Sequence, residues 1–243
     1  PAGSNTLISD EGIPGLTIST RKLNDLTTHL EGSKLKIEAL AGTPKLLVMK
    51  QFLNHGLNPA LFLAGIPGDI AGGVVMNAGV AEDIVPREFV EIVEWFEVVR
   101  DGKILKFQNS DIKWSYRKSE GWQPGIIVKV GLQWEGKKIE DLESIVKKAN
   151  EVRFSKQPLD MPSCGSVFVN PKGHKSAKLI EETGLKGLKI GGAQVSTKHA
   201  NFIVNLGDAK ASDIHQLILK VQSQVKSKHG IDLHNEVCYL GKW

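Results

Sequence analysis

The chain has 243 residues, of which 41% are apolar and 24% are charged, and its formal net charge at pH 7 is +4. This composition is typical of a globular protein with a sizeable core, and so small a positive charge does not indicate a nucleic-acid partner. No apolar run is long enough for membrane insertion, and the first residues lack the basic start and apolar stretch of a signal peptide.

The first half of the chain predicts short strands, one helix and many glycines. After a loop, we expect strands over residues 16–20 and 34–40. A Thr cap, Pro at the first helical position and a Gly stop predict a helix over residues 44–55. Residues 91–107 read as a hairpin that turns at Asp101-Gly102, and residues 125–136 read as a further strand.

The second half predicts a more compact mixture of helices and short strands. Helices are expected over residues 139–156, 176–187 and 212–230, the second closed by a glycine at 184 and the third by Gly230. Short strands are expected within residues 157–173, 200–209 and 235–241. Together the two halves predict an α+β fold.

The stretch "GIPGDIAGGVVMNAGV" over residues 65–80 has a composition that is poor material for a core helix. Its glycines are Gly65, Gly68, Gly72, Gly73 and Gly79. Glycines let main chain approach a flat or phosphorylated ligand closely, and Asn77 offers a side-chain amide. The pattern is not that of a Rossmann site, because no G-x-G-x-x-G precedes a long helix. A tight structural crossover is the alternative interpretation.

Two further loops could carry chemistry. Gly3, Ser4 and Asn5 could direct backbone N–H groups toward an anion, although this loop taken alone favours a plain turn. "PSCGSVFVNP" contains Ser166 but no hydrolase elbow, and Cys164 is best interpreted as a structural thiol. Because two cysteines make neither a disulfide framework nor a metal site, we expect a cytoplasmic protein that binds no metal.

Taken together, these loops resemble one family, the UDP-N-acetylenolpyruvoylglucosamine reductases, which are flavoenzymes of peptidoglycan precursor synthesis. The resemblance rests on "AGSNTLISDEG", "LAGIPGDIAGGVVMNAG", "SYR", "QPLDMPSCGSVFVNP", "LIEETGLKGLKIGGAQVSTKHANFIVN" and "NEVCYLG", which occur in the family's order. The variant that lacks a long tyrosine-bearing insertion fits best.

The resemblance implies an FAD-binding domain over residues 1–138 and a substrate-binding domain over residues 139–243. The first would be of the vanillyl-alcohol-oxidase-like type, without its first strand–helix–strand unit. In this family NADPH reduces FAD, which then reduces the enolpyruvyl ether of UDP-N-acetylglucosamine to UDP-N-acetylmuramate. We expect a monomer whose partners are these small molecules.

The resemblance also assigns residues to roles. Arg117 would polarise the substrate carboxylate, and Glu236, with a raised pKa, would act together with Arg117. Ser166 would give a proton to the α carbon after hydride reaches the β carbon. The residues implied in FAD binding are Gly3, Ser4, Asn5, Gly65, Pro67, Gly68, Gly72, Gly73, Asn77 and Gly79. Those implied in substrate binding are Tyr116, Lys156 and Asn170.

The chain departs from the family pattern in two places near the implied site. "NAG" is followed by Val80 and then by the acidic pair Glu82 and Asp83 rather than by Ala-Tyr-Gly, and Cys238 stands where the family has Arg. Beside the reductase, two alternatives remain open. One is a binding or regulatory module that retained the fold but lost FAD, and the other is an FAD oxidase with a different substrate.

Overall fold

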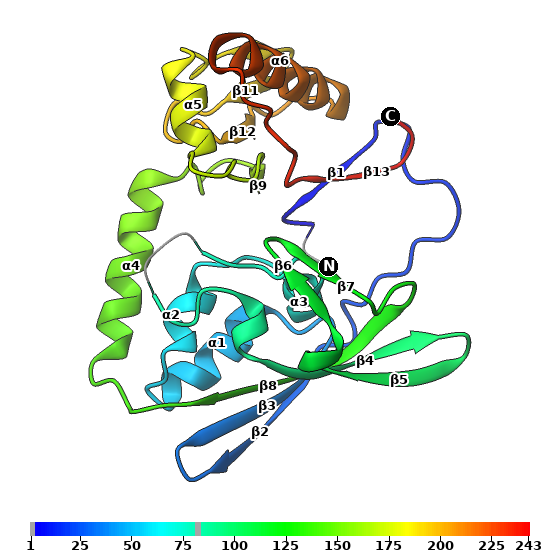
Figure 1. Ribbon diagram of the computed structural model, residues 1–243, viewed down its shortest axis with the longest axis vertical. Coiled ribbons are helices and arrows are strands. Elements are labelled where there is room, and N and C mark those ends of the chain that lie inside the picture. Colours follow the sequence, from blue (N-terminus) through cyan, green and yellow to red (C-terminus); the bar gives the residue numbers. More distant parts are fainter. Residues whose placement is uncertain (1–2, 81–83) are drawn as a thin grey trace. The chain divides into compact units, whose positions relative to one another are not determined.

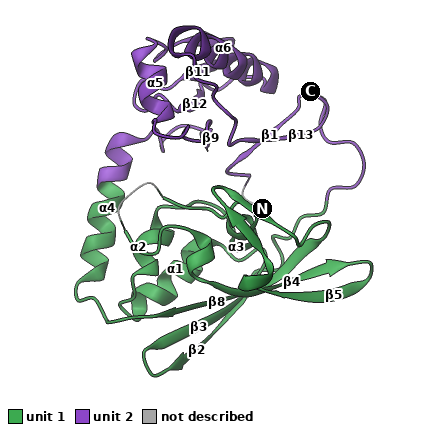
Figure 2. Cartoon of the chain, in the orientation of Figure 1, with its two compact units in different colours: residues 1–2, 18–151 green, residues 3–17, 152–243 purple. Residues whose placement is uncertain are grey.

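The computed structural model describes residues 3–80 and 84–243, and it divides the chain into two units (Figure 2). Within the described residues, unit 1 is Ile18–Glu151, and unit 2 combines Gly3–Thr17 with Val152–Trp243. The division therefore falls inside helix α4 (Leu142–Lys156), and the N-terminal loop belongs with the C-terminal part of the chain.

Unit 1 is built on an antiparallel sheet of five strands in the order β2-β3-β8-β4-β5. The strands are β2 (Leu26–Glu31), β3 (Lys34–Leu40), β4 (Val93–Arg100), β5 (Lys103–Gln108) and β8 (Ile126–Glu135). The alternation of apolar and polar residues in β3 buries Leu35, Ile37 and Ala39 on one face of the sheet.

Three helices cover that face of the sheet in unit 1 (Figure 1). They are α1 (Lys45–Asn54), α2 (Pro59–Ala64) and α3 (Ile70–Val75). Two 3₁₀ turns, Phe89–Glu91 and Asn109–Asp111, and a small hairpin, β6 (Lys113–Ser115) with β7 (Lys118–Glu120), complete unit 1.

Unit 2 contains a four-stranded antiparallel sheet in the order β10-β11-β12-β9 and two packed helices. Its elements are β9 (Ser163–Ser166), α5 (Ser176–Glu182), β10 (Lys189–Ile190), β11 (Ala193–Val195), β12 (Phe202–Asn205) and α6 (Ala211–His229). The buried face of α6, including Leu217, Val221 and Val225, packs in one core with Ile180 of α5. A separate parallel pair, β1 (Thr6–Ile8) with β13 (Cys238–Leu240), joins the two ends of the described chain.

Most local predictions are confirmed, and the fold is α+β as expected. The hairpin turns at Asp101 and Gly102, whose φ angles of 51° and 71° suit a type I′ turn. Gly230 ends α6 with a left-handed φ of 69°.

Two local predictions are wrong. Residues 16–20 form no strand, and Leu16 is 87% exposed, because no neighbouring strand pairs with this segment in the described structure. The glycine-rich stretch does form a core helix, α3, because burial of Ile70 and Val74 outweighs the weak helix propensity of its two glycines.

Candidate functional site

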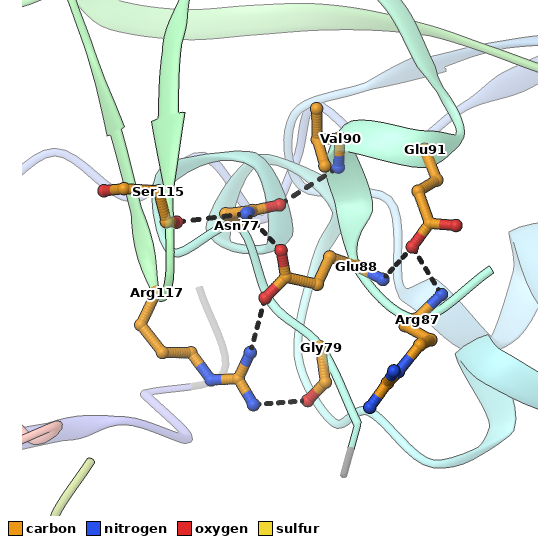
Figure 3. Close-up of polar contacts among 8 residues, drawn as sticks. All are labelled: Asn77, Gly79, Arg87, Glu88, Val90, Glu91, Ser115 and Arg117. Atoms are coloured by element: carbon orange, nitrogen blue, oxygen red, sulfur yellow. Dashed lines mark hydrogen bonds and ion pairs between the residues drawn. The ribbon is translucent and has the colours of Figure 1, made fainter. Parts of the chain in front are cut away.

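Arg117 lies in the turn of the β6–β7 hairpin of unit 1, with a left-handed φ of 60°. Its guanidinium is mostly buried, with only 12% of the side chain exposed. Nη2 donates to the carbonyl of Gly79 at 2.9 Å, and Nη1 lies 3.5 Å from Oε1 of Glu88 (Figure 3). Non-glycine residues with a left-handed φ cost free energy and persist where the surroundings require them. The turn and these two contacts therefore hold the Arg117 guanidinium in a fixed position.

Asn77 and Glu88 complete the polar cluster around Arg117 (Figure 3). The buried Asn77 amide donates to Oε2 of Glu88 at 3.0 Å and to the carbonyl of Ser115 at 3.1 Å, and its oxygen accepts from the Val90 amide at 3.0 Å. Asn77 also has a left-handed φ, of 36°. Its side chain therefore links the end of the glycine-rich stretch to the strand that precedes Arg117.

The glycines of residues 65–80 differ in what surrounds them. A Cβ on Gly73 would lie 2.2 Å from the Phe89 ring, and a Cβ on Gly79 would lie 2.7 Å from Nη1 of Arg117, so both glycines allow close packing. A Cβ on Gly72 would meet nothing within 4 Å, and Gly72 is exposed. Gly72 therefore leaves bare main chain open on the surface of α3, whereas its neighbour serves the core.

The start of the glycine-rich stretch, residues 65–68, is partly exposed loop. Gly68 has a left-handed φ of 96°, which favours glycine at this position. Gly65 ends α2, and Pro67 is exposed. The loop is joined to the start of α1 through the amide of Lys45, which donates to the carbonyl of Gly68 at 3.0 Å.

In unit 2 the structure brings Ser166 and Glu236 onto neighbouring main-chain segments. The Glu236 amide donates to the carbonyl of Val167, the residue after Ser166, at 2.8 Å. Next to them, Phe168 and Asn235 form an isolated β-bridge. Both Ser166 and Glu236 are half-buried. A hydroxyl and a carboxylate from distant parts of the sequence are thus carried by adjacent main-chain segments.

The N-terminal loop of unit 2 lies against the same two segments. The side-chain amide of Asn5 donates to the backbone carbonyl of Glu236 at 2.9 Å. The backbone carbonyl of Asn5 accepts from the backbone amide of Cys238 at 2.9 Å. A Cβ on Gly165 would lie 3.7 Å from the Ser4 carbonyl. A Cβ on Gly3, which has a φ of 66°, would meet nothing within 4 Å. The loop predicted to bind a cofactor therefore also positions the main chain of Glu236.

The three residues implied in substrate binding have different surroundings. Tyr116 is 51% exposed, and the Arg117 guanidinium lies 4.6 Å from the centre of its ring. Lys156 is exposed at the end of α4. The side-chain oxygen of Asn170 accepts from the Ser176 amide at 3.0 Å, at the start of α5. Tyr116 belongs to unit 1, whereas Lys156 and Asn170 belong to unit 2.

The cysteines show different environments. Cys164 is half-buried, its thiol contacts the Thr6 carbonyl at 3.3 Å, and burial raises the pKa of the thiol. Cys238 is exposed on β13, and burial of its sulfur together with the charge of Glu236 raises its pKa. A raised pKa disfavours the nucleophilic thiolate, in agreement with a structural Cys164. The acidic pair Glu82 and Asp83 lies outside the described residues.

Sequence reasoning missed Glu88 and Lys45 as members of this region. Glu88 carries no motif, because its contacts to Arg117 and Asn77 form only in the folded chain. Lys45 has a signal that was available: it shares the i, i+3, i+4, i+7 spacing of the buried residues Val48, Met49 and Phe52. Within the described residues, no cluster of His, Cys, Asp or Glu could hold a metal ion, and no helix is long and apolar enough to cross a membrane.

Comparison with known proteins agrees with the resemblance. A family model described as "UDP-N-acetylenolpyruvoylglucosamine reductase, C-terminal domain" matches residues 157–240. The UDP-N-acetylenolpyruvoylglucosamine reductase of Synechococcus sp. (strain CC9605) is 42% identical over 99% of this chain and 79% of its own length. That of Clostridium botulinum (strain 657 / Type Ba4) is 38% identical over 99% of this chain and 76% of its own length.

A solved structure is also similar along nearly the whole chain. The crystal structure of UDP-N-acetylenolpyruvylglucosamine reductase from Thermus caldophilus has a TM-score of 0.74 and 31% sequence identity, and the match covers 98% of this chain and 83% of that one. Sequence identity of this level over this length shows common family membership. The chain belongs to the UDP-N-acetylenolpyruvoylglucosamine reductase family and is an oxidoreductase.

Proposed function

We propose that this protein reduces the enolpyruvyl ether of UDP-N-acetylglucosamine to UDP-N-acetylmuramate, with FAD as cofactor and NADPH as reductant. The observation that carries the proposal is the placement of Ser166 and Glu236 on hydrogen-bonded neighbouring segments, next to the Asn5 loop. A proton donor and a carboxylate supplied from separate motifs are what the second half of this reaction requires.

The glycine-rich stretch has the chemistry to hold FAD. Gly72 leaves main chain open on α3, and Gly3 does so in the N-terminal loop, so a planar or phosphorylated group could approach the backbone closely at both places. Gly65, Pro67 and Gly68 belong to the loop before α3, and Ser4 and Asn5 belong to the N-terminal loop. Gly73, Asn77 and Gly79 instead pack against or bond to neighbouring residues of unit 1. Bound FAD would supply the hydride chemistry.

The protein's own residues deal with the charge that hydride addition creates. When hydride adds to the β carbon of the enolpyruvyl group, electron density develops on the α carbon and its carboxylate. The guanidinium of Arg117 is a fixed cation that would polarise this carboxylate. The hydroxyl of Ser166, a half-buried residue at the end of β9, would give its proton to the α carbon. Glu236 would act with Arg117 on the carboxylate.

Other expectations remain part of this proposal. Tyr116, Lys156 and Asn170 would contact the sugar nucleotide, and unit 1 would form the larger part of an FAD-binding domain of the vanillyl-alcohol-oxidase-like type. Residues 139–243 would form the substrate-binding domain. We propose that the protein acts as a monomer in the cytoplasm, with UDP-sugar and NADPH as its small-molecule partners.

Replacing Ser166 by Ala tests the proton-donor role. We expect flavin reduction by NADPH to keep the parent rate, because that step needs no proton from Ser166. Reoxidation by the enolpyruvyl sugar nucleotide should slow by about 10²–10⁴-fold, the usual contribution of general acid catalysis. Stopped-flow absorbance of the flavin band follows the two half-reactions separately.

Ser163→Ala is the matched control, because Ser163 is an exposed serine of the same strand. It should leave both half-reactions unchanged. Equal rates for Ser166→Ala and the parent protein in both steps would contradict the assigned role. A protein that is colourless as purified and takes up no added FAD would favour the alternative of a binding module without catalysis.

A further inference from the structure

Lys45 is a buried lysine that the proposed chemistry does not use. It is the first residue of α1, its side chain lies on the helix face that also buries Val48 and Phe52, and only 4% of its surface is exposed. Lysine is almost never buried to this extent unless its charge is compensated. Its position in the core therefore requires an explanation.

Two hydrogen bonds of Lys45 lead to the glycine-rich loop. Nζ donates to the carbonyl of Pro67 at 2.8 Å, and the backbone amide donates to the carbonyl of Gly68 at 3.0 Å. The Ile70 amide donates to the Thr43 carbonyl at 3.0 Å, and together with the Lys45–Gly68 bond it forms the isolated β-bridge between Pro44 and Asp69. Three hydrogen bonds thus join residues 43–45 to residues 67–70, and the Lys45 side chain provides one of them.

The charges around Lys45 compensate its ammonium only in part. Burial lowers its pKa from 10.5 to about 7, and the nearby charge of Asp69 opposes this shift. On another side Nζ lies 5.4 Å from the centre of the Phe89 ring. The carboxylates that flank Phe89 are engaged elsewhere: Glu88 contacts Arg117, and Glu91 accepts from the amides of residues 87 and 88. A further negative charge at the loop would therefore favour the protonated lysine.

We propose that Lys45 is a positioning residue for a pyrophosphate-bearing cofactor: it fixes the main chain at Pro67 and Gly68 and supplies a positive charge next to that loop. This inference rests on the proposed function, because it takes the loop to be part of the FAD site. When the anion binds, the ammonium form becomes the favoured form, so binding takes up a proton at a pH where the free protein has released it.

The same lysine should reduce the stability of the cofactor-free protein in a pH-dependent way. The unfolded chain keeps this proton up to its ordinary pKa of 10.5, whereas the folded chain releases it near 7. The unfolded state therefore binds more protons between these values, and the free energy of unfolding rises with pH across them. Below pH 7 the cost of the buried charge is fully present. Lys45→Met should thus raise the melting temperature most at pH 6, with a smaller gain at pH 9.5.

Calorimetric titration with FAD at pH 8, in two buffers of different ionisation enthalpy, measures the proton uptake. With a pKa of about 7, roughly nine-tenths of the lysine is neutral at pH 8, so uptake should approach about 0.9 proton per FAD. Lys45→Met should abolish the uptake and weaken FAD binding about tenfold or more. Lys50→Met, which removes an exposed lysine of the same helix, should behave as the parent.

Lys45→Arg provides a second variant if Lys45→Met folds poorly. Its guanidinium is always charged, so it should bind FAD without proton uptake and keep its affinity as the pH rises from 7 to 9. FAD binding to the parent protein without proton uptake at pH 8 would overturn the inference and leave the proposed function intact. A parent protein that binds no FAD would contradict the proposed function itself, together with the inference that rests on it.

Discussion

At the scale of single residues, the environment of Arg117 is the most informative feature of unit 1. Its guanidinium lies between the Gly79 carbonyl and the Glu88 carboxylate, and Asn77 holds Glu88 from the other side. Arg117 and Asn77 both have left-handed φ angles that cost free energy in non-glycine residues. A guanidinium held in this way loses little conformational entropy when it contacts the carboxylate of a substrate. Such preorganisation makes electrostatic stabilisation effective.

Glu88→Gln tests whether this positioning matters for the reaction. We expect kcat/KM for the enolpyruvyl sugar nucleotide to fall about tenfold, the value of one charge-assisted hydrogen bond, while flavin reduction by NADPH is unchanged. Steady-state and half-reaction kinetics measure both quantities. Glu120→Gln serves as the control. It removes an exposed carboxylate that pairs with Lys118 in the β6–β7 hairpin, which also carries Arg117. An unchanged kcat/KM for Glu88→Gln would mean that Arg117 is positioned without it.

At the scale of elements, α3 shows how two adjacent glycines serve different purposes. Gly73 faces the ring of Phe89 in the core, and Gly72 faces open space on the exposed side of the helix. The sequence allowed either a ligand-binding or a packing interpretation of this stretch, and the structure separates them residue by residue. Gly73 fits the packing interpretation, whereas Gly72 has no neighbour that requires a glycine.

Alanine substitutions distinguish the two glycines experimentally. Gly73→Ala should destabilise the protein by about 1–3 kcal/mol, because its Cβ would overlap the Phe89 ring. Gly72→Ala should stabilise α3 by up to about 1 kcal/mol, since alanine is the better helix former, but it should weaken FAD binding if main chain meets the cofactor there. Thermal unfolding and flavin titration of both variants supply the measurements. Full FAD affinity in Gly72→Ala would remove this residue from the proposed site.

At the scale of the whole molecule, the chain ends meet within unit 2. β1 pairs in parallel with β13, and the Asp10 carboxylate accepts hydrogen bonds from the amides of Ala211 and Ser212 at the start of α6. These bonds, with that from the Ser212 hydroxyl, lower the pKa of Asp10. The N-terminal loop that carries Ser4 and Asn5 is thus attached to the C-terminal elements at both of its ends.

Asp10→Ala tests this attachment. We expect faster amide hydrogen exchange in residues 6–8 and in the first turn of α6, because the charged cap of the helix is lost. In the parent protein the cap is fully present above the ordinary aspartate pKa of 3.8 and is lost as the pH falls through the lowered value. Glu11→Ala removes a neighbouring exposed carboxylate and should leave the exchange unchanged. Equal protection in Asp10→Ala and the parent would contradict the proposed anchor.

The sequence by itself determined the features that depend on residues close together in the chain. The Asp101-Gly102 turn and the Gly230 stop of α6 are signals of this kind, because they form their hydrogen bonds locally. The predicted Thr cap of α1 does not form: α1 begins at Lys45, and the Thr43 hydroxyl donates to the carbonyl of Asp25. Its motifs also indicated the reductase family, because a family is defined by residue types in a fixed order.

Only the tertiary structure decided which distant segments meet. The pairing of β1 with β13 places Asn5 beside Glu236. Gly73 packs against the Phe89 ring in the core, whereas its neighbour Gly72 faces open space. Among the described residues it likewise left residues 16–20 without a strand partner, and it placed Lys45 in the core. The physical reason is that burial and strand pairing depend on surfaces contributed by the whole unit, so the free energy of a segment in its place is not a property of that segment alone.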